Sequence, residues 1–292
     1  MRILFLLSFV FVACSDDAPP ITDVPTTPPV DVQEPDDAQE PSDAQEPADA
    51  QELSDVAADI EQTEDSGPAV CPLIDPEVVT FRTDDDVELE AAFFAAPTAG
   101  RPALVLFHMI PPSNTRGNYR RPFIDQLVTQ CINVLNVDRR GAGGSGGVAR
   151  DAYEGPGGAS DARAAFDFLL AHEIAPDASH MAMVGASNGT TSLNDYASLE
   201  VSPVSLVAAV LLSGGGYTEN QTPMSASGLR ELPALFVYPA SEAAWNDGVE
   251  EDTEPGWRFM SHTASAHGTR MLDDEDAASA VIAFLSEFLV ES

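Results

Sequence analysis

The residue of this chain best suited to chemistry is a serine between two glycines. Gly185-Ala-Ser187-Asn-Gly189 has the pattern G-x-S-x-G. An apolar run of strand length, 181–184, precedes it, and a stretch of helix length follows at about 190–199. A strand, a sharp turn and a helix in this order lift a serine Oγ out of a sheet as a nucleophile. The glycines are needed because the turn strains the backbone and leaves no room for a Cβ.

A nucleophilic serine also needs a base, because a hydroxyl is a weak nucleophile until its proton is removed. Two of the five histidines, His262 and His267, follow the last expected strand, at the edge of the sheet where the serine would lie. We expect His267 to be the base, since the adjacent Gly268 allows close approach; His262 is the alternative. Of the other three, His172 falls in a predicted helix, His180 precedes the strand before Ser187, and His108 lies in a loop after an early strand.

The elements that must position these residues can be predicted from the apolar runs. The run 103–107 is continuous, which fits a strand buried on both faces, and 77–81 with 87–94 reads as a hairpin. Further strands are expected at 132–137, 181–184, 204–212, 234–238 and 257–260. Helices are expected at 119–130, 190–199 and 277–290. Another helix is expected to begin with Ser160 as its cap and to carry Ala162, Phe166, Leu169 and Leu170. Such alternation predicts a mostly parallel sheet with helices on both faces.

Four segments give the chain, over about 78–290, a resemblance to the α/β-hydrolase superfamily. It is similar to the dienelactone-hydrolase-like and esterase-like members in particular. The segments are L-F-H-M at 106–109, D-R-R-G-A-G-G-S at 138–145, the G-x-S-x-G motif, and A-H-G-T at 266–269. The resemblance implies an α/β-hydrolase fold with a mostly parallel central sheet, helices on both faces and little or no cap domain.

The resemblance also implies a catalytic triad in the chain order serine, acid, histidine. Ser187 would be the nucleophile and His267 the base, with the acid just after the seventh strand. Glu242 is the nearest carboxylate there, and Asp247 is the alternative if the loop is longer. Relatives tend to have an aspartate one or two positions after the equivalent of Glu242, where this chain has alanine, so the acid stays open between the two.

An oxyanion formed in such a site needs two backbone N–H groups. The geometry of the turn assigns one to Asn188, and the loop after 103–107 assigns the other to Met109. Arg139 and Arg140 could bind a substrate carboxylate, but ion pairs that fix their loop are the preferred interpretation. The glycine-rich 141–147 lacks a following G-K-[ST], and no metal-ligand cluster is visible, so no cofactor and no metal are expected.

The N-terminus has the pattern of an export signal. Residues 1–13 carry one arginine before an apolar stretch too short to span a membrane. F-V-A-C at 11–14 resembles the lipobox of bacterial lipoproteins, which implies a lipid on Cys14 and attachment to a bacterial membrane, on its periplasmic or cell-surface face. The alternative is an ordinary cleaved signal with an incidental cysteine.

Residues 14–70 are predicted to be a disordered acidic, proline-rich tether. Four copies of a six-residue unit resembling Asp-Ala-Gln-Glu-Pro-Ser fill 31–54, and 15–70 contains neither a basic nor an aromatic residue. Such a segment cannot offset the entropy lost on ordering, and self-repulsion keeps it extended. The folded domain is therefore expected at 71–292.

Composition excludes nucleic acid as a partner and leaves open whether two cysteines form a disulfide. The formal net charge is −35 and all 13 basic residues are arginine, so the surface should repel nucleic acid. After Cys14, the remaining cysteines are Cys71 and Cys131. Export would favour a disulfide between them, but two unpaired small apolar residues fit the sequence equally well.

Together these features predict a membrane-tethered serine hydrolase that cleaves ester, thioester or lactone bonds in small molecules. The alternative is a non-catalytic binding or interaction lipoprotein on a degenerate hydrolase scaffold. The segments 214–232 and 248–256 would set the substrate, and their folding does not follow from the sequence.

Overall fold

The computed structural model describes residues 70–263 and 265–290. The expected signal segment 1–13, the lipidation site Cys14 and nearly all of the expected tether 14–70 lie outside the described residues. Among the helices of the described part, none combines the length and the apolar character needed to cross a membrane.

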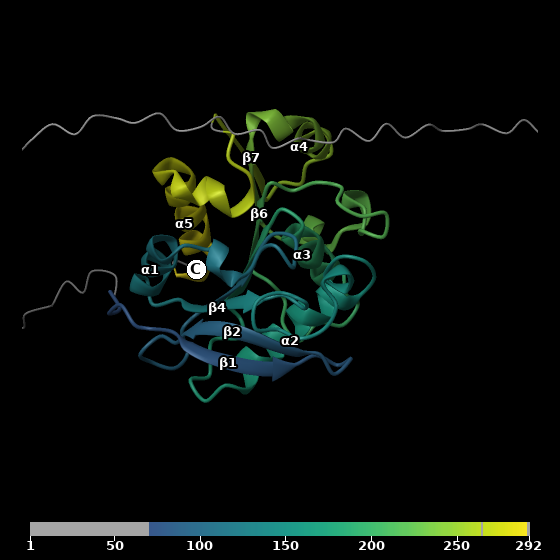
Figure 1. Cartoon of the computed structure of the whole chain (residues 1–292). Helices are drawn as coiled ribbons and strands as arrows, with labels where there is room; N and C mark the ends of the chain where they lie inside the picture. The colour runs from purple at the N-terminus through teal and green to yellow at the C-terminus, as the bar shows by residue number, and fades with distance from the viewer. Residues whose placement is uncertain (1–69, 264, 291–292) are drawn as a thin grey trace, which may run out of the picture. The chain divides into compact units, whose positions relative to one another are not determined.

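Within the described residues, eight strands form one sheet in the order β1-β2-β4-β3-β5-β6-β7-β8. β2 runs antiparallel to both of its neighbours, and every other pair is parallel. This confirms the predicted N-terminal hairpin and the mostly parallel sheet (Figure 1). The strands are β1 Glu77–Arg82, β2 Glu88–Phe94, β3 Ala103–Phe107, β4 Asn133–Asp138, β5 Met181–Ala186, β6 Ala208–Leu212, β7 Ala234–Pro239 and β8 Trp257–His262.

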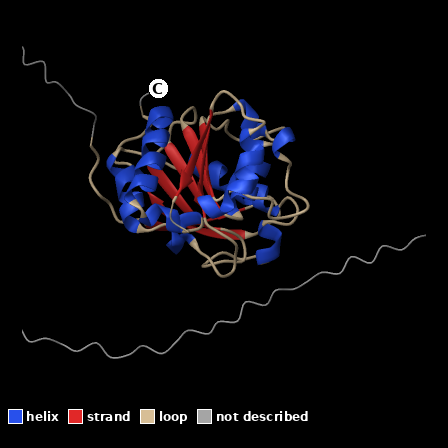
Figure 2. Cartoon of the chain, turned by 90° about the horizontal axis from the view of Figure 1, so that it is seen from above, coloured by secondary structure: helices blue, strands red, loops and turns tan. Residues whose placement is uncertain are grey.

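Helices cover both faces of the sheet, as Figure 2 shows from above. Side chains alternate along each strand, so Leu104 and Leu106 of β3 join the core under α1 and α5, while Val105 and Phe107 join the core under α2, α3 and α4. This two-sided burial explains the continuous apolar run of β3. The helices are α1 Arg121–Thr129, α2 Gly157–Ala171, α3 Gly189–Ala197, α4 Ala243–Glu250 and α5 Glu275–Leu289.

Local differences from the sequence predictions arise where packing outweighs local signals. α2 begins at Gly157 after Pro156, and the hydroxyl of Ser160 donates to Asp84 instead of capping the helix. Leu170, predicted to be buried, is 40% exposed. β6 begins at Ala208, although the apolar run starts at residue 204, and α4 was not predicted. Its eight residues hold a glycine, a tryptophan and an asparagine, so propensity gave little helix signal there.

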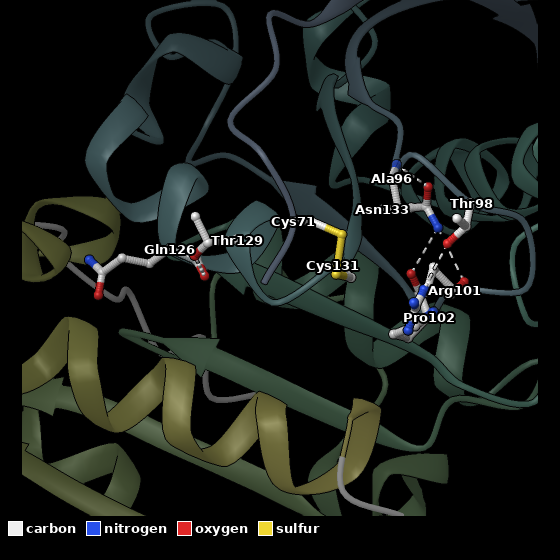
Figure 3. The surroundings of a disulfide bond; sticks show 9 residues. All are labelled: Cys71, Ala96, Thr98, Arg101, Pro102, Gln126, Thr129, Cys131 and Asn133. Carbon is white, nitrogen blue, oxygen red and sulfur yellow. Dashed lines mark hydrogen bonds between the residues drawn. A yellow bond between two sulfur atoms is a disulfide. The ribbon is translucent and has the colours of Figure 1, made fainter. Parts of the chain in front are cut away.

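A disulfide joins Cys71 to Cys131, a pairing that the sequence left open. It links the segment before β1 to the turn between α1 and β4 (Figure 3). The two Cα atoms are 5.1 Å apart, and the backbone N–H of Cys71 donates to Thr129 O at 2.9 Å. The N-terminal end of the described domain is thereby fixed to its core.

One edge of the sheet collects the loops that matter for chemistry. β3 to β8 all run parallel, so their carboxyl ends share that edge. The connection between β6 and β7, residues 213–233, contains only two short 3₁₀-helices, Met224–Ala226 and Gly228–Glu231. This agrees with the expectation of little or no cap domain.

Candidate active site

Ser187 stands at the turn between β5 and α3 in a left-handed conformation, with φ of 50°. Its N–H donates to Leu212 O on β6 at 2.7 Å, which anchors the turn to the sheet. A Cβ on Gly185 would lie 2.7 Å from Gly189 O, and one on Gly189 would lie 2.6 Å from His108 O. The strain and crowding inferred from the G-x-S-x-G pattern are thus both present.

His267 connects Ser187 to Glu242. Its Nε2 lies 2.6 Å from Ser187 Oγ, and its Nδ1 lies 2.5 Å from Glu242 Oε1. A carboxylate only accepts, so Nδ1–H donates to Glu242 and the neutral Nε2 accepts from the serine hydroxyl. The ring therefore has the tautomer that a general base for serine needs.

The backbone directly after His267 is held by the end of a neighbouring strand. Gly268 has φ of 59°, and its N–H donates to Ser213 Oγ, just after β6, at 2.9 Å. A Cβ on Gly268 would lie 2.6 Å from the sulfur of Met109. Glycine is therefore favoured next to the histidine, because its positive φ suits glycine and a Cβ would displace the side chain of Met109.

The two carboxylates that sequence left open lie in different places. Glu242 ends the 3₁₀-helix Ala240–Glu242 that directly follows β7, and it contacts His267. The chain then continues straight into α4, which carries Asp247 on its exposed side. Among the described residues, no hydrogen bond joins Asp247 to His267. The absence of a longer loop leaves Glu242 as the carboxylate at the histidine.

Met109 and Asn188, the two residues expected to supply oxyanion donors, follow β3 and Ser187. Within the part of the chain that the structure describes, neither backbone N–H donates to a protein acceptor. His108 orients the loop: its Nδ1 lies 2.7 Å from Met109 O, and its Nε2 accepts from Arg139 N–H at 3.0 Å. Both donors are thus available to a ligand oxygen, as an oxyanion site requires.

The remaining histidines have structural partners. His262, the alternative base, is buried at the end of β8, where its Nε2 lies 3.0 Å from Asp274 Oδ1 at the start of α5. His172 packs against Phe93, and His180 lies 2.7 Å from Asp177. None of these contacts includes Ser187.

The neighbouring arginines behave differently from each other. Arg140 forms the expected ion pairs, at 2.7 Å to both Asp85 and Asp161. The expectation of an ion pair is wrong for Arg139, which is fully buried and has no carboxylate partner among the described residues. Its guanidinium bonds instead to backbone and neutral side-chain oxygens, including Asn188 Oδ1 at 2.9 Å. Neither arginine is free to bind a substrate carboxylate.

Tyr217, in the connection after β6, was missed by sequence reasoning. Its hydroxyl donates to Ser213 O, and burial, countered by a hydrogen bond with Ser187, raises the pKa of Tyr217 to about 12. It also lines a cavity of about 500 Å³ with Arg150, Tyr153, Glu154, Thr218, Glu219 and Asn220. The segment 214–232 was expected to set the substrate, but no local signal pointed to Tyr217, whose approach to Ser187 depends on tertiary packing.

Comparison with known proteins identifies the scaffold. No family model and no curated protein matches the chain. Solved structures do. An esterase of Pyrococcus furiosus has a TM-score of 0.57 at 17% identity, covering 73% of this chain and 91% of its own. A dienelactone hydrolase of Anabaena variabilis has a TM-score of 0.53 at 17% identity, covering 75% and 99%.

The chain has the α/β-hydrolase fold. An esterase of Rhodococcus sp. is similar as well, with a TM-score of 0.51 at 15% identity over 72% of this chain and 99% of that one. On an α/β-hydrolase sheet, the turn after β5 holds the nucleophile and the loop after β3 supplies an oxyanion donor. Those are the locations of Ser187 and Met109 here.

Proposed function

We propose that this protein is a serine hydrolase that cleaves ester, thioester or lactone bonds in small molecules. The observation that carries the proposal is the continuous hydrogen-bonded series from Ser187 Oγ through His267 to Glu242, at 2.6 Å and 2.5 Å. The esterases and the dienelactone hydrolase among the similar structures support it, since they share the scaffold.

Acylation follows from this geometry. As Ser187 Oγ attacks the substrate carbonyl carbon, its proton moves to His267 Nε2, and Glu242 stabilises the imidazolium that forms. The carbonyl oxygen becomes an oxyanion, which the N–H groups of Met109 and Asn188 receive. His267 then gives the proton to the leaving oxygen or sulfur, and an acyl-serine remains.

Deacylation uses the same groups in reverse order. His267 takes a proton from water, and the resulting hydroxide attacks the acyl-serine carbonyl. The tetrahedral oxyanion again binds the N–H groups of Met109 and Asn188. Collapse releases the acid and returns the proton to Ser187 Oγ.

The rival function is a non-catalytic binding lipoprotein on this scaffold. Its support is the missing aspartate one or two positions after Glu242. That support is weakened because Glu242 itself contacts His267 Nδ1, so the departure from the pattern of relatives leaves the histidine with a carboxylate.

Hydrolysis of p-nitrophenyl acetate tests the proposal. Ser187→Ala should lower kcat by roughly 10⁴ or more, since the nucleophile is lost, while the circular dichroism spectrum stays native. A fluorophosphonate should label the wild type and not the variant. Activity of the alanine variant near that of the wild type would contradict the assignment, and an inactive, unlabelled wild type would favour the binding function.

We further propose that a lipid on Cys14 holds this domain at a bacterial membrane surface through the acidic segment. The support is the F-V-A-C sequence and the composition of residues 15–70. The Cys71–Cys131 disulfide also fits an exported protein, because such bonds persist in oxidising compartments. Cys14→Ser should move the protein from the membrane fraction to the soluble one, and membrane association that persists in that variant would count against lipidation.

A further inference from the structure

Arg139 is a buried cation that forms no direct ion pair with a carboxylate among the described residues. Its exposed fraction is 0%, and its Nε has no hydrogen-bond partner in the described part of the chain. Burial lowers the pKa of the guanidinium to about 10, so it remains charged at neutral pH. Asp161 pairs with Arg140 and acts on Arg139 only through its charge, so the desolvation of Arg139 outweighs this attraction and the burial costs stability.

The contacts of Arg139 converge on the two segments that carry the oxyanion donors. Nη1 donates to His108 O at 3.3 Å and to Asn188 Oδ1 at 2.9 Å, with Met109 O at 3.5 Å. Its backbone N–H donates to His108 Nε2 at 3.0 Å. Arg139 thus contacts the loop after β3 three times and the residue after Ser187 once.

The opposite side of the guanidinium is fixed to the scaffold. Nη2 donates to Ala152 O at 2.6 Å and to Ser192 Oγ, on α3, at 2.8 Å. The central carbon of the guanidinium lies 5.9 Å from the centre of the Phe107 ring. The planar group therefore has a single orientation, set by β3, α3 and the 3₁₀-helix Ala149–Ala152.

We propose that Arg139 is a positioning residue that holds Met109 and Asn188 so that their N–H groups meet at one point, and whose charge favours the oxyanion formed there. This rests on the proposed serine hydrolase function. Carbonyl oxygens drawn toward the guanidinium keep the N–H groups of the same loop facing the other way, toward the substrate. Arg139 does not contact substrate itself, so it acts through these two residues.

The neighbouring Arg140 provides a matched control. It is also buried and in the same loop, but its guanidinium contacts Asp85 and Asp161 rather than the oxyanion segments. The experiment compares Arg139→Met, Arg139→Lys and Arg140→Lys with p-nitrophenyl acetate at a temperature well below each unfolding midpoint. Ser187→Ala and the wild type are measured beside them.

Arg139→Met should lower kcat about 10²-fold, similar to the loss of one oxyanion donor, with KM within threefold of the wild type. Arg139→Lys keeps the charge and should recover about tenfold of that loss. Arg140→Lys should retain kcat within threefold while its unfolding midpoint falls. The Ki of a trifluoromethyl ketone, which forms a tetrahedral adduct with serine, should rise in Arg139→Met by the factor that kcat/KM falls.

Three outcomes would overturn the proposal. If Arg139→Met keeps a wild-type kcat, the residue has no part in the oxyanion site. If Arg140→Lys loses as much kcat as Arg139→Lys, the effect belongs to the folding of the loop. If the wild type has no activity that depends on Ser187, the hydrolase function fails and this inference fails with it.

Discussion

At the scale of single residues, the candidate site depends on two short hydrogen bonds. In each of them the donor must carry the proton and the acceptor must lack one. In the proposed mechanism, Glu242 fixes the tautomer of His267, and His267 in turn receives the proton of Ser187. A carboxylate in this position accepts from Nδ1–H, whereas an amide could instead donate to it and favour the wrong tautomer. The choice between Glu242 and Asp247 can therefore be tested by amide substitutions.

Glu242→Gln should lower kcat by roughly 10²–10³, comparable to removing one well-placed transition-state interaction, with little change in KM. Asp247→Asn is the matched control and should stay within twofold of the wild type, because Asp247 is exposed on α4. Steady-state kinetics of the two single variants and the double variant measure this. Reversed effects would identify Asp247 as the acid, and two silent variants would show that His267 works without a carboxylate.

His108 contributes to the same site by staying neutral. Burial and then the charge of Arg139 lower the pKa of His108 to about 3, so its Nε2 remains an acceptor for Arg139 N–H. In the unfolded chain the pKa returns to about 6.5. Between these values the unfolded state binds a proton that the folded state does not, so the free energy of unfolding must fall as pH falls below 6.5.

From this linkage we expect a larger effect of pH in the wild type than in His108→Gln. Lowering the pH from 7 to 5 should reduce the free energy of unfolding of the wild type by about 2 kcal/mol more than that of the variant. Glutamine keeps a donor and an acceptor but does not titrate. Urea unfolding of both proteins at the two pH values measures the difference, in which the contributions of the carboxylates largely cancel. Equal pH dependence in the two proteins would show that the pKa of His108 is the same in the folded and the unfolded state.

At the scale of elements, the site depends on how closely α3 approaches the end of β3. Gly189 begins α3, and a Cβ there would lie 2.6 Å from His108 O and 2.7 Å from Phe107 O. These are backbone atoms of a central strand and its loop, so they cannot rotate away as a side chain would. Any displacement would move the loop that carries Met109 away from Ser187.

Gly189→Ala should destabilise the protein by about 1–3 kcal/mol and lower kcat, because the added methyl overpacks this contact. Gly248→Ala is the matched control: it lies in α4, and a Cβ there meets nothing within 4 Å. This second change should stabilise by up to about 1 kcal/mol, since alanine favours helix over glycine. Thermal unfolding and kinetics test the pair. A Gly189→Ala variant as stable and active as the wild type would refute the close approach.

At the scale of the described domain, the Cys71–Cys131 bond restrains the chain most broadly. It closes a sequence separation of 60 residues that includes β1, β2, β3 and α1. Such a loop limits the conformations of the unfolded chain, and in the folded domain it ties the segment before β1 to the turn before β4.

Replacing both cysteines by alanine should lower the free energy of unfolding by about 4 kcal/mol, from the entropy of a loop of this length. Activity at 25 °C should persist, because the bond lies at the amino-terminal side of the sheet, away from Ser187. Urea unfolding of the variant and of the wild type, with and without reductant, measures the effect. A reductant that changes neither protein would mean that the bond does not form.

Sequence alone singled out Ser187 as the candidate nucleophile and determined its turn and most of the sheet. Those features are local: a G-x-S-x-G motif after an apolar run needs only neighbouring residues to specify a strained turn, and the strand periodicity is fixed by two-sided burial. The preference for His267 also followed from order along the chain. The hairpin, β3, β4, β5 and β7 were therefore predicted to within one or two residues.

Tertiary structure decided which carboxylate meets His267, whether the cysteines pair, and what Arg139 does. Each depends on distances between segments far apart in the chain, and so on the length of a loop and the angle of a helix. The helix α4 directly after Glu242 removed the longer loop that Asp247 would need. The position of Tyr217 has no local signature in the sequence. The same holds for the carbonyl partners of Arg139, because every residue has a backbone oxygen and only packing brings a particular one to the guanidinium.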